Sequence, residues 1–377
     1  MLEAQNIRVL MVDSEETWRG GQSQVALLMT GLADRGVHVE LAAPPGSAIA
    51  RKAEEHAIPV RGLRISGGAD GRAVWVLGRY VKEGRYDVVH CHSSHAHGAA
   101  WLALGLARGG RPKERRPKLV VSRRVDFPVG KNGASALKYR RGVDKFLAIS
   151  SGVRRVLLDA GVGEARIEIV PSGIDFGKFE GIGDTSYLRE EFGIREGTTV
   201  IGNVAALAPH KSQADFVRAA EIIGKEVPGA RFFIVGEGEL RGELEALVRE
   251  LGLESVVALT GFRRDVLGLL SMFDCFVLSS YLEGLCTSIM DAHVLGVPVV
   301  ATRTGGVPDL VEDGRTGLLV APRDPEGLAA AVLRMLRDGG LRSRCVALAK
   351  EKSAGYDYRR MVAQTLYAYR SLLAKTV

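Results

Sequence analysis

Two carboxylates eight positions apart, Glu283 and Asp291, are the residues of this sequence best suited to chemistry. They open the segment 279–320, which continues into an apolar stretch and a glycine-rich turn. If a helix covers residues 284–295, Glu283 lies at its N-terminal edge and Asp291 about two turns further on, near the same face. Carboxylates accept hydrogen bonds from hydroxyls, and N–H groups at a helix start bind phosphate. The pattern predicts a site for a polyhydroxylated ligand; two unrelated acids on a surface helix are the alternative.

Lys211 is the candidate cation for a phosphate. It lies in the loop 208–213, after an apolar strand pattern at 199–207, and Ser212 follows at the expected entry to a helix. A lysine beside a helix N-terminus combines a positive charge with unpaired N–H donors, which together suit a diphosphate. Taken without its context, an isolated lysine is more often a solvated side chain.

Two more apolar strand patterns, 231–235 and 256–260, are each followed by a glycine, Gly236 and Gly261. Glycine allows another group to approach the backbone closely, because it has no Cβ. Taken alone, each is an ordinary turn at the end of a strand.

The first half of the sequence offers arginines at turns and strand ends. Arg19 precedes Gly20 and Gly21 between a strand and a helix, although the G-x-G-x-x-G spacing of a dinucleotide site is absent. Arg123 and Arg124 follow another apolar strand, and an arginine fork engages phosphate through two parallel hydrogen bonds. An ordinary turn and a pair of solvated arginines are the respective alternatives.

Four histidines, His90, His92, His95 and His97, lie within eight residues at the end of a strand. A metal site is one interpretation, but no adjacent Asp or Glu completes a ligand set. His90 and His92 share one face of the strand, so packing or hydrogen bonding to its neighbour also explains them. His95 and His97, just beyond the strand, are expected to face a ligand cleft.

The order of these motifs resembles the donor-site signature of the retaining glycosyltransferases of family 4, which have the GT-B fold. The matching residues run from Glu283-Gly284-Leu285 through Asp291 to the apolar VPVVAT, GGVPDLV and TGLLV runs. The resemblance implies that Glu283 holds the hydroxyls of the donor sugar, Asp291 holds the ribose, and Lys211 binds the diphosphate. It also implies that a further set of residues contacts the donor, including its nucleobase: Arg19, Gly20, Gly21, Gly236, Glu237, Phe262, Arg263, Arg264, Gly284, Leu285, Cys286 and Thr287.

The sequence departs from the family pattern at three positions. Asp291 is one methylene shorter than the family's glutamate, and Ala206 stands where the family has an arginine. The family's T-x-H histidine, which lies near the reacting sugar, is replaced at Arg124. An arginine there would supply the charge missing at Ala206 or bind a phosphorylated acceptor. The prediction is therefore catalytic roles for Glu283, Lys211, Arg124 and His97, and acceptor binding by His95, His97, Arg123 and Arg124.

Short apolar runs alternate with helical patterns along the whole chain, which indicates α/β domains that position these residues. We expect two doubly wound parallel sheets, at residues 1–177 and 178–355, facing across a cleft. The resemblance implies that a final helix, at about 356–377, packs back on the first domain. The chain has 377 residues, which is enough for two cores.

Composition narrows the expected surroundings and partners. No apolar run reaches 18 residues, the N-terminus lacks a signal-peptide layout, and the four cysteines show no CxxC spacing, so we expect a cytoplasmic protein. The net charge of +7 and the basic loop 108–118 favour an anionic partner. Peripheral contact with an anionic membrane fits this charge better than nucleic acid, because no recognition helix or aromatic platform accompanies the loop.

The sequence thus predicts transfer of a sugar, with retained anomeric configuration, from a nucleotide-diphosphate sugar to an acceptor hydroxyl. Neither a metal nor another cofactor is expected. We expect the acceptor to be a cell-surface glycan precursor, such as lipopolysaccharide core, capsule or glycolipid. A nucleotide-sugar 2-epimerase of the same fold and a non-catalytic nucleotide-sugar or nucleic-acid binding protein are the alternatives.

Overall fold

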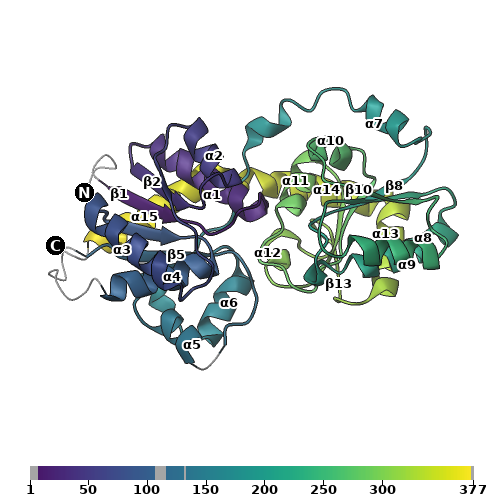
Figure 1. Cartoon of the computed structure of the whole chain (residues 1–377). Coiled ribbons are helices and arrows are strands. Elements are labelled where there is room, and N and C mark those ends of the chain that lie inside the picture. The colour runs from purple at the N-terminus through teal and green to yellow at the C-terminus, as the bar shows by residue number, and fades with distance from the viewer. Residues whose placement is uncertain (1–6, 107–115, 131–132, 375–377) are drawn as a thin grey trace. The chain divides into compact units, whose positions relative to one another are not determined.

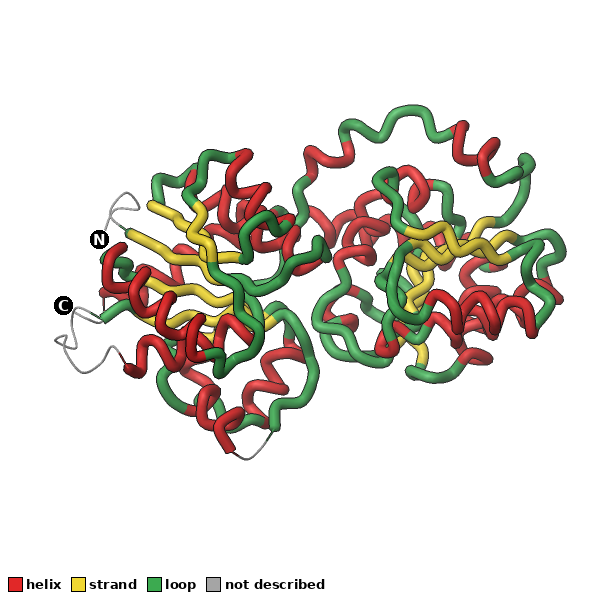
Figure 2. The backbone as a smooth tube through the Cα atoms, in the orientation of Figure 1, coloured by secondary structure: helices red, strands yellow, loops and turns green. Residues whose placement is uncertain are grey.

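The computed structural model describes residues 7–106, 116–130 and 133–374, and it divides the chain into two units (Figure 1). Unit 1 comprises Met1–Gly173 and Tyr358–Val377, and unit 2 comprises Ile174–Asp357. The units differ slightly from the expected 1–177 and 178–355, because the chain leaves unit 1 four residues earlier, after Gly173. Figure 2 shows strands inside each unit with helices around them.

Unit 1 has a seven-stranded parallel sheet in the order β3-β2-β1-β4-β5-β6-β7. The chain winds outward from β1 in one direction and from β4 in the other, so the topological switch point lies between these neighbouring strands. The strands are β1 (Arg8–Val12), β2 (His38–Ala43), β3 (Val60–Gly62), β4 (Val88–Cys91), β5 (Lys118–Arg123), β6 (Lys145–Ala148) and β7 (Ile167–Ile169). The helices are α1 (Gly20–Ala33), α2 (Ala48–Glu55), α3 (Gly71–Gly84), α4 (Ser94–Leu106), α5 (Gly133–Arg140), α6 (Ser151–Asp159) and α15 (Tyr358–Ala374).

Unit 2 repeats this architecture with six parallel strands in the order β10-β9-β8-β11-β12-β13. Its switch point lies between β8 and β11. The strands are β8 (Val200–Val204), β9 (Arg231–Val235), β10 (Val257–Gly261), β11 (Cys275–Leu278), β12 (Val299–Thr302) and β13 (Leu318–Val320). The helices are α7 (Ser186–Glu191), α8 (Gln213–Glu226), α9 (Arg241–Glu250), α10 (Val266–Ser271), α11 (Thr287–Leu295), α12 (Val307–Leu310), α13 (Pro325–Arg337) and α14 (Gly339–Ser353). The predicted fold class, two doubly wound parallel-sheet domains, is confirmed.

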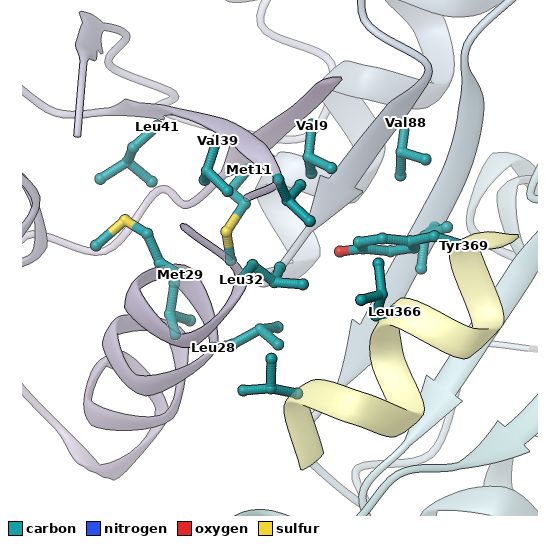
Figure 3. Packing of buried hydrophobic residues seen from close by; sticks show 14 of the residues in the cluster. Val9, Met11, Leu28, Met29, Leu32, Val39, Leu41, Val88, Leu366 and Tyr369 are labelled. Atoms are coloured by element: carbon teal, nitrogen blue, oxygen red, sulfur yellow. The ribbon is translucent and has the colours of Figure 1, made fainter. Parts of the chain in front are cut away.

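The inner strands of both sheets, such as β1, β4, β11 and β12, are almost wholly buried, which explains why their sequences are continuous runs of mostly apolar residues rather than alternating ones. In unit 1, Leu28 and Leu32 of α1 pack with Leu366 and Tyr369 of α15 beneath strand residues such as Val9 (Figure 3). Residues more than 300 positions apart in the chain therefore share one core. In unit 2, α8 and α13 cover the sheet with a second apolar cluster.

A buried hydrogen bond fixes the C-terminal helix to the sheet of unit 1. The Tyr369 hydroxyl lies 2.6 Å from Nδ1 of His90 in β4, and both residues are fully buried. On the opposite side of the ring, His90 Nε2 lies 2.8 Å from the Ser122 hydroxyl in β5. Burial lowers the pKa of His90 to about 3, so the ring is neutral at physiological pH and bridges two hydroxyls without a charge.

The substitution Tyr369→Phe removes one partner of this buried chain. We expect the free energy of unfolding to fall by about 1–3 kcal/mol, because a buried ring nitrogen loses its hydrogen bond. Chemical denaturation of the variant measures the change. Tyr367→Phe in the same helix is the matched control, since Tyr367 is 67% exposed and should lose almost nothing. Equal stabilities for both variants would contradict the structural role of the His90 bond.

Candidate functional site

The switch point of unit 2 brings Lys211 and Glu283 together. Lys211 ends a short 3-10 helix (Pro209–Lys211) after β8, and Glu283 lies in the loop after the neighbouring strand β11. Lys211 Nζ forms an ion pair with Glu283 Oε2, and the two side chains are only 16% and 9% exposed. Ser280 also donates a hydrogen bond to Glu283 Oε2, at 3.4 Å. Ligands commonly bind at such a switch point, outside the carboxyl ends of the strands.

Hydrogen bonds between the two loops hold this ion pair in place. The Ser279 hydroxyl donates to the Lys211 carbonyl at 2.9 Å, and the Tyr281 N–H donates to the His210 carbonyl at 2.9 Å. Ser212 adopts a left-handed conformation with φ of 51°, which turns the chain from the 3-10 helix into α8. The approach of the two loops therefore depends on backbone contacts as well as on the two charges.

Helix α11 begins at Thr287, so the predicted start at Gly284 is wrong by three residues. Glu283 lies before the N-cap residue Cys286, in a buried stretch that includes Gly284 and Leu285. The Gly306 N–H donates to the Glu283 carbonyl at 2.9 Å and so links this stretch to the loop after β12. Burial raises the pKa of the Cys286 thiol to about 12, which keeps it neutral at physiological pH.

Asp291 is paired with a different lysine from Glu283. Its Oδ1 lies 2.6 Å from Nζ of Lys178, which is in the 3-10 helix Phe176–Phe179. Burial raises the pKa of Asp291, and the positive charge of Lys178 opposes this increase. Each acid of the motif therefore has its own lysine.

Glycines bring the ends of three strands of unit 2 together. Gly236 follows β9 with φ of 144°, and a Cβ there would lie 2.0 Å from the carbonyl oxygen of Ala205. Its N–H donates to the carbonyl of Gly261, which ends β10, at 3.0 Å. Phe262 follows directly and is 69% exposed, so its ring is available to a ligand. Glu237 is half exposed and is paired with Arg241 at 2.7 Å.

Arg263 and Arg264 differ sharply in their contacts. Arg263 forms an ion pair with Glu191 at 2.6 Å and with Asp265 at 2.7 Å. These bonds tie the turn after β10 to α7, so Arg263 has a structural contact where a donor contact was predicted. Arg264 is exposed and has no hydrogen bond or ion pair with any residue that the structure describes. Ala206, which stands at the expected arginine position, has no charged side chain, and its carbonyl oxygen accepts hydrogen bonds from the Gln213 side chain at 2.9 Å and from the Ala208 N–H at 3.0 Å.

In unit 1, polar residues gather at the carboxyl ends of β1, β4 and β5. Asp13 follows β1, is fully buried, and accepts hydrogen bonds from the Glu15 N–H at 2.8 Å and from Gln22 at 3.4 Å. Burial raises its pKa. His92 follows β4, is 6% exposed, and lies with its ring 4.1 Å from that of His90. No residue in the described ranges forms a hydrogen bond with either ring nitrogen of His92.

The three candidate arginines of unit 1 differ in their contacts. Arg123 is 8% exposed and donates to the Tyr139 hydroxyl and the Phe127 carbonyl. It therefore holds the loop after β5, where an acceptor contact was predicted. Arg124 lies beside the start of α1, with its Cδ 3.9 Å from where a Cβ on Gly21 would be. Arg19, the N-cap residue of α1, is exposed.

The prediction that His97 faces a ligand cleft is wrong. His97 is 1% exposed and packs edge-on against Tyr139 and Phe146, with ring centroids 5.0 and 5.9 Å away. Its Nε2 lies 3.2 Å from the Lys138 carbonyl, and burial lowers its pKa to about 3. The reason is the start of α4 at Ser94, which turns His97 into the core while His95 stays exposed.

Three remaining features concern metal ligands, membrane spans and the basic loop. Among the described residues no three His, Cys, Asp or Glu side chains are grouped as metal ligands. None of the described helices is long and apolar enough to cross a bilayer. Most of the basic loop 108–118, namely residues 108–115, lies outside the described residues.

Sequence reasoning missed three residues of these clusters: Asp13, Lys178 and Tyr369. Asp13 could have been identified from the sequence, because it is a polar residue directly after the apolar run of β1. Lys178 and Tyr369 could not, since their partners, Asp291 and His90, are 113 and 279 positions away in the sequence.

Two known protein families match this chain, and individual proteins are similar to it over most of its length. The family described as Glycosyltransferase Family 4 matches residues 18–178, and the family described as Glycosyl transferases group 1 matches residues 184–352. The D-inositol 3-phosphate glycosyltransferase of Mycobacteroides abscessus is 31% identical over 310 residues, or 77% of this chain and 67% of that protein. The UDP-Gal:α-D-GlcNAc-diphosphoundecaprenol α-1,3-galactosyltransferase of Escherichia coli is 27% identical over 299 residues, or 74% of each chain.

A solved structure has the same fold over nearly the whole chain. Anabaena Alr3699/HepE in complex with UDP superposes with a TM-score of 0.82 at 21% identity, covering 97% of this chain and 100% of that one. At this identity the likeness concerns the fold.

The raised pKa of Asp291 gives a pH test of its burial. A carboxyl whose pKa is higher in the folded than in the unfolded state binds more protons when folded. Its favourable contribution is therefore present at low pH and is lost as pH rises from the unfolded value of about 3.9 through the folded value. We expect the stability of Asp291→Asn relative to the native chain to increase with pH across this window, as measured by thermal unfolding.

Asp184→Asn is the control for this titration. Hydrogen bonds from Ser186 lower the pKa of the exposed Asp184, so its contribution to stability is present above the unfolded value and is lost as pH falls. The relative stability of Asp184→Asn should therefore change with pH in the opposite direction. Parallel trends for the two variants would mean that Asp291 is not a desolvated carboxylate.

Proposed function

The chain belongs to the family 4, group 1 glycosyltransferases, and from this premise we propose that it transfers a sugar from a nucleotide-diphosphate sugar to an acceptor hydroxyl with retention of anomeric configuration. One observation carries the proposal. Lys211 and Glu283, a cation suited to a diphosphate and a carboxylate suited to sugar hydroxyls, meet at the switch point of unit 2.

The ion pair gives each residue a defined part in donor binding. As the donor binds, the diphosphate replaces Glu283 as the partner of Lys211, and sugar hydroxyls replace Lys211 as the partner of Glu283. Departure of the nucleoside diphosphate then increases negative charge next to Lys211, which stabilises that charge in the transition state. Glu283 orients the sugar and so positions the anomeric carbon. Asp291 accepts hydrogen bonds from the ribose.

The nucleoside part of the donor is proposed to lie at the ends of β9 and β10. Backbone that approaches closely at Gly236 and Gly261, together with the exposed ring of Phe262, supports a base-binding role for this edge. The solved Anabaena relative contains UDP, which makes uridine the first base to test.

The proposed acceptor is a hydroxyl of a cell-surface glycan or glycolipid precursor. The name of one relative supports this class, since that protein acts on a diphosphoundecaprenol-linked sugar. We place the reaction in the cytoplasm, with peripheral contact to an anionic membrane rather than nucleic acid. The net charge of +7 supports an anionic surface as partner.

The proposed reaction needs no metal or other cofactor. Lys211 supplies a positive charge for the leaving diphosphate, and the unpaired N–H groups at helix starts add to it. Transfer should therefore proceed at the same rate after treatment with EDTA.

The substitutions Glu283→Gln and Lys211→Met test these roles. We expect both to reduce the rate of transfer on the order of 10²- to 10³-fold, because each removes a polar contact to the donor. Lys211→Met should also weaken nucleoside diphosphate binding, whereas Glu283→Gln should retain it, since the carboxylate contacts the sugar. Transfer is measured from UDP-sugars in the presence of EDTA, and binding is measured by the thermal shift that the nucleotide produces.

Lys225→Met and Glu221→Gln are matched controls, because these residues form an exposed ion pair at 2.8 Å in the same unit. Both control variants should keep native transfer and native UDP binding. Native activity of Glu283→Gln would contradict the donor-sugar role, and UDP binding without any transfer by the native chain would favour a non-catalytic binding protein.

A further inference from the structure

Arg124 is a partly buried arginine whose guanidinium has no hydrogen-bond partner among the described residues. It follows β5, and burial lowers its pKa to about 10, so the guanidinium is still charged at neutral pH. It makes no hydrogen bond or ion pair with any residue in the described parts of the chain, and its Nε is buried without an acceptor. A guanidinium has five N–H donors, and a donor that is buried without an acceptor, as at Nε, is unfavourable. The adjacent Arg123, by contrast, is bonded to Tyr139 and Phe127.

Asp13 is the carboxylate whose charge acts on Arg124, but its oxygens do not bind the guanidinium. The negative charge of Asp13 favours the charged guanidinium, but the two side chains form no ion pair. The oxygens of Asp13 are instead used by the Glu15 N–H and by Gln22. Asp13 therefore favours the charged form of Arg124 without using its N–H donors.

His92 is a second unpartnered polar group in this cluster. It is 6% exposed, and neither ring nitrogen has a hydrogen-bond partner among the described residues. The charge of Arg124 contributes to holding the pKa of His92 well below its usual value, after burial itself and the neighbouring His90. A neutral imidazole next to the guanidinium offers an N–H to the same ligand.

The start of α1 adds further donors beside Arg124. Gly21, in the first turn of this 14-residue helix, lies against the Arg124 side chain, and Arg19 provides no capping hydrogen bond. The first N–H groups of a helix have no partner within the helix and carry a partial positive charge. Arg124, His92 and the first turn of α1 thus gather donors and positive charge in unit 1.

We propose that Arg124, with His92 and the first turn of α1, forms a binding site for an oxyanion of a substrate, either a phosphate or a carboxylate. The inference deepens the proposed function and rests on it, because the oxyanion belongs to one of the two substrates of the transfer. An arginine fork matches the paired oxygens of such a group. The site would make the enzyme selective for a substrate with a charge at this position.

Inorganic phosphate is the probe for this site. Isothermal titration of the whole chain with phosphate should show binding that weakens at least tenfold in Arg124→Gln. Arg155→Gln is the matched control, because Arg155 is an exposed arginine of the same unit and should leave phosphate affinity unchanged. Should Arg124→Gln fail to fold, Arg124→Lys retains the charge without the fork and is expected to bind phosphate more weakly than the native chain. Equal phosphate affinities in the native chain and the foldable Arg124 variant would overturn the proposal.

A second titration, in saturating UDP, distinguishes the two sources of the oxyanion. If UDP abolishes the Arg124-dependent binding of phosphate, the site takes the diphosphate of the donor. If that binding persists, the site takes an anionic group of the acceptor or of the donor sugar. The same experiment measures UDP binding by the native chain, and its absence would contradict the proposed function rather than the Arg124 site.

Discussion

The ion pair between Lys211 and Glu283 is the interaction on which the donor site depends. It exists because a parallel, doubly wound sheet places the ends of β8 and β11 side by side, although 72 residues separate the two side chains in the chain. The pair is largely excluded from water, so each charge needs a partner at all times. A ligand that brings both a phosphate and hydroxyls can replace the pair without leaving either charge alone.

The sheet of unit 1 also brings polar and charged side chains together at the ends of its strands, but there the cation and the acid form no ion pair. Asp13 and His92 end the two strands at its switch point, and Arg124 follows the next strand of the sheet. Here Asp13 accepts hydrogen bonds from backbone and from Gln22, and Arg124 has no hydrogen-bond acceptor among the residues that the structure describes. Unit 2 pairs its charges in the free protein, whereas unit 1 keeps an arginine ready for an anion.

The fold could be predicted because buried parallel strands leave continuous apolar runs, as at 199–207 and 231–235, and glycines mark their ends. The start of α11 could not, since the residues after Glu283 suit a helix and the contact that opposes it comes from Gly306, 23 positions away. The prediction that His97 faces a cleft is wrong for a similar reason. The spacing of four histidines within eight residues cannot reveal that Tyr139 and Phe146 pack against the His97 ring. Arg263 has local and distant acids, Asp265 and Glu191, and only the first is apparent from the sequence.

The most direct measurement is a crystal structure of the chain with UDP bound. We expect a phosphate oxygen within hydrogen-bonding distance of Lys211 Nζ, with the contact between Lys211 and Glu283 opened and the base next to Phe262. A nucleotide bound elsewhere, with the ion pair between Lys211 and Glu283 still intact, would contradict the account of the donor site.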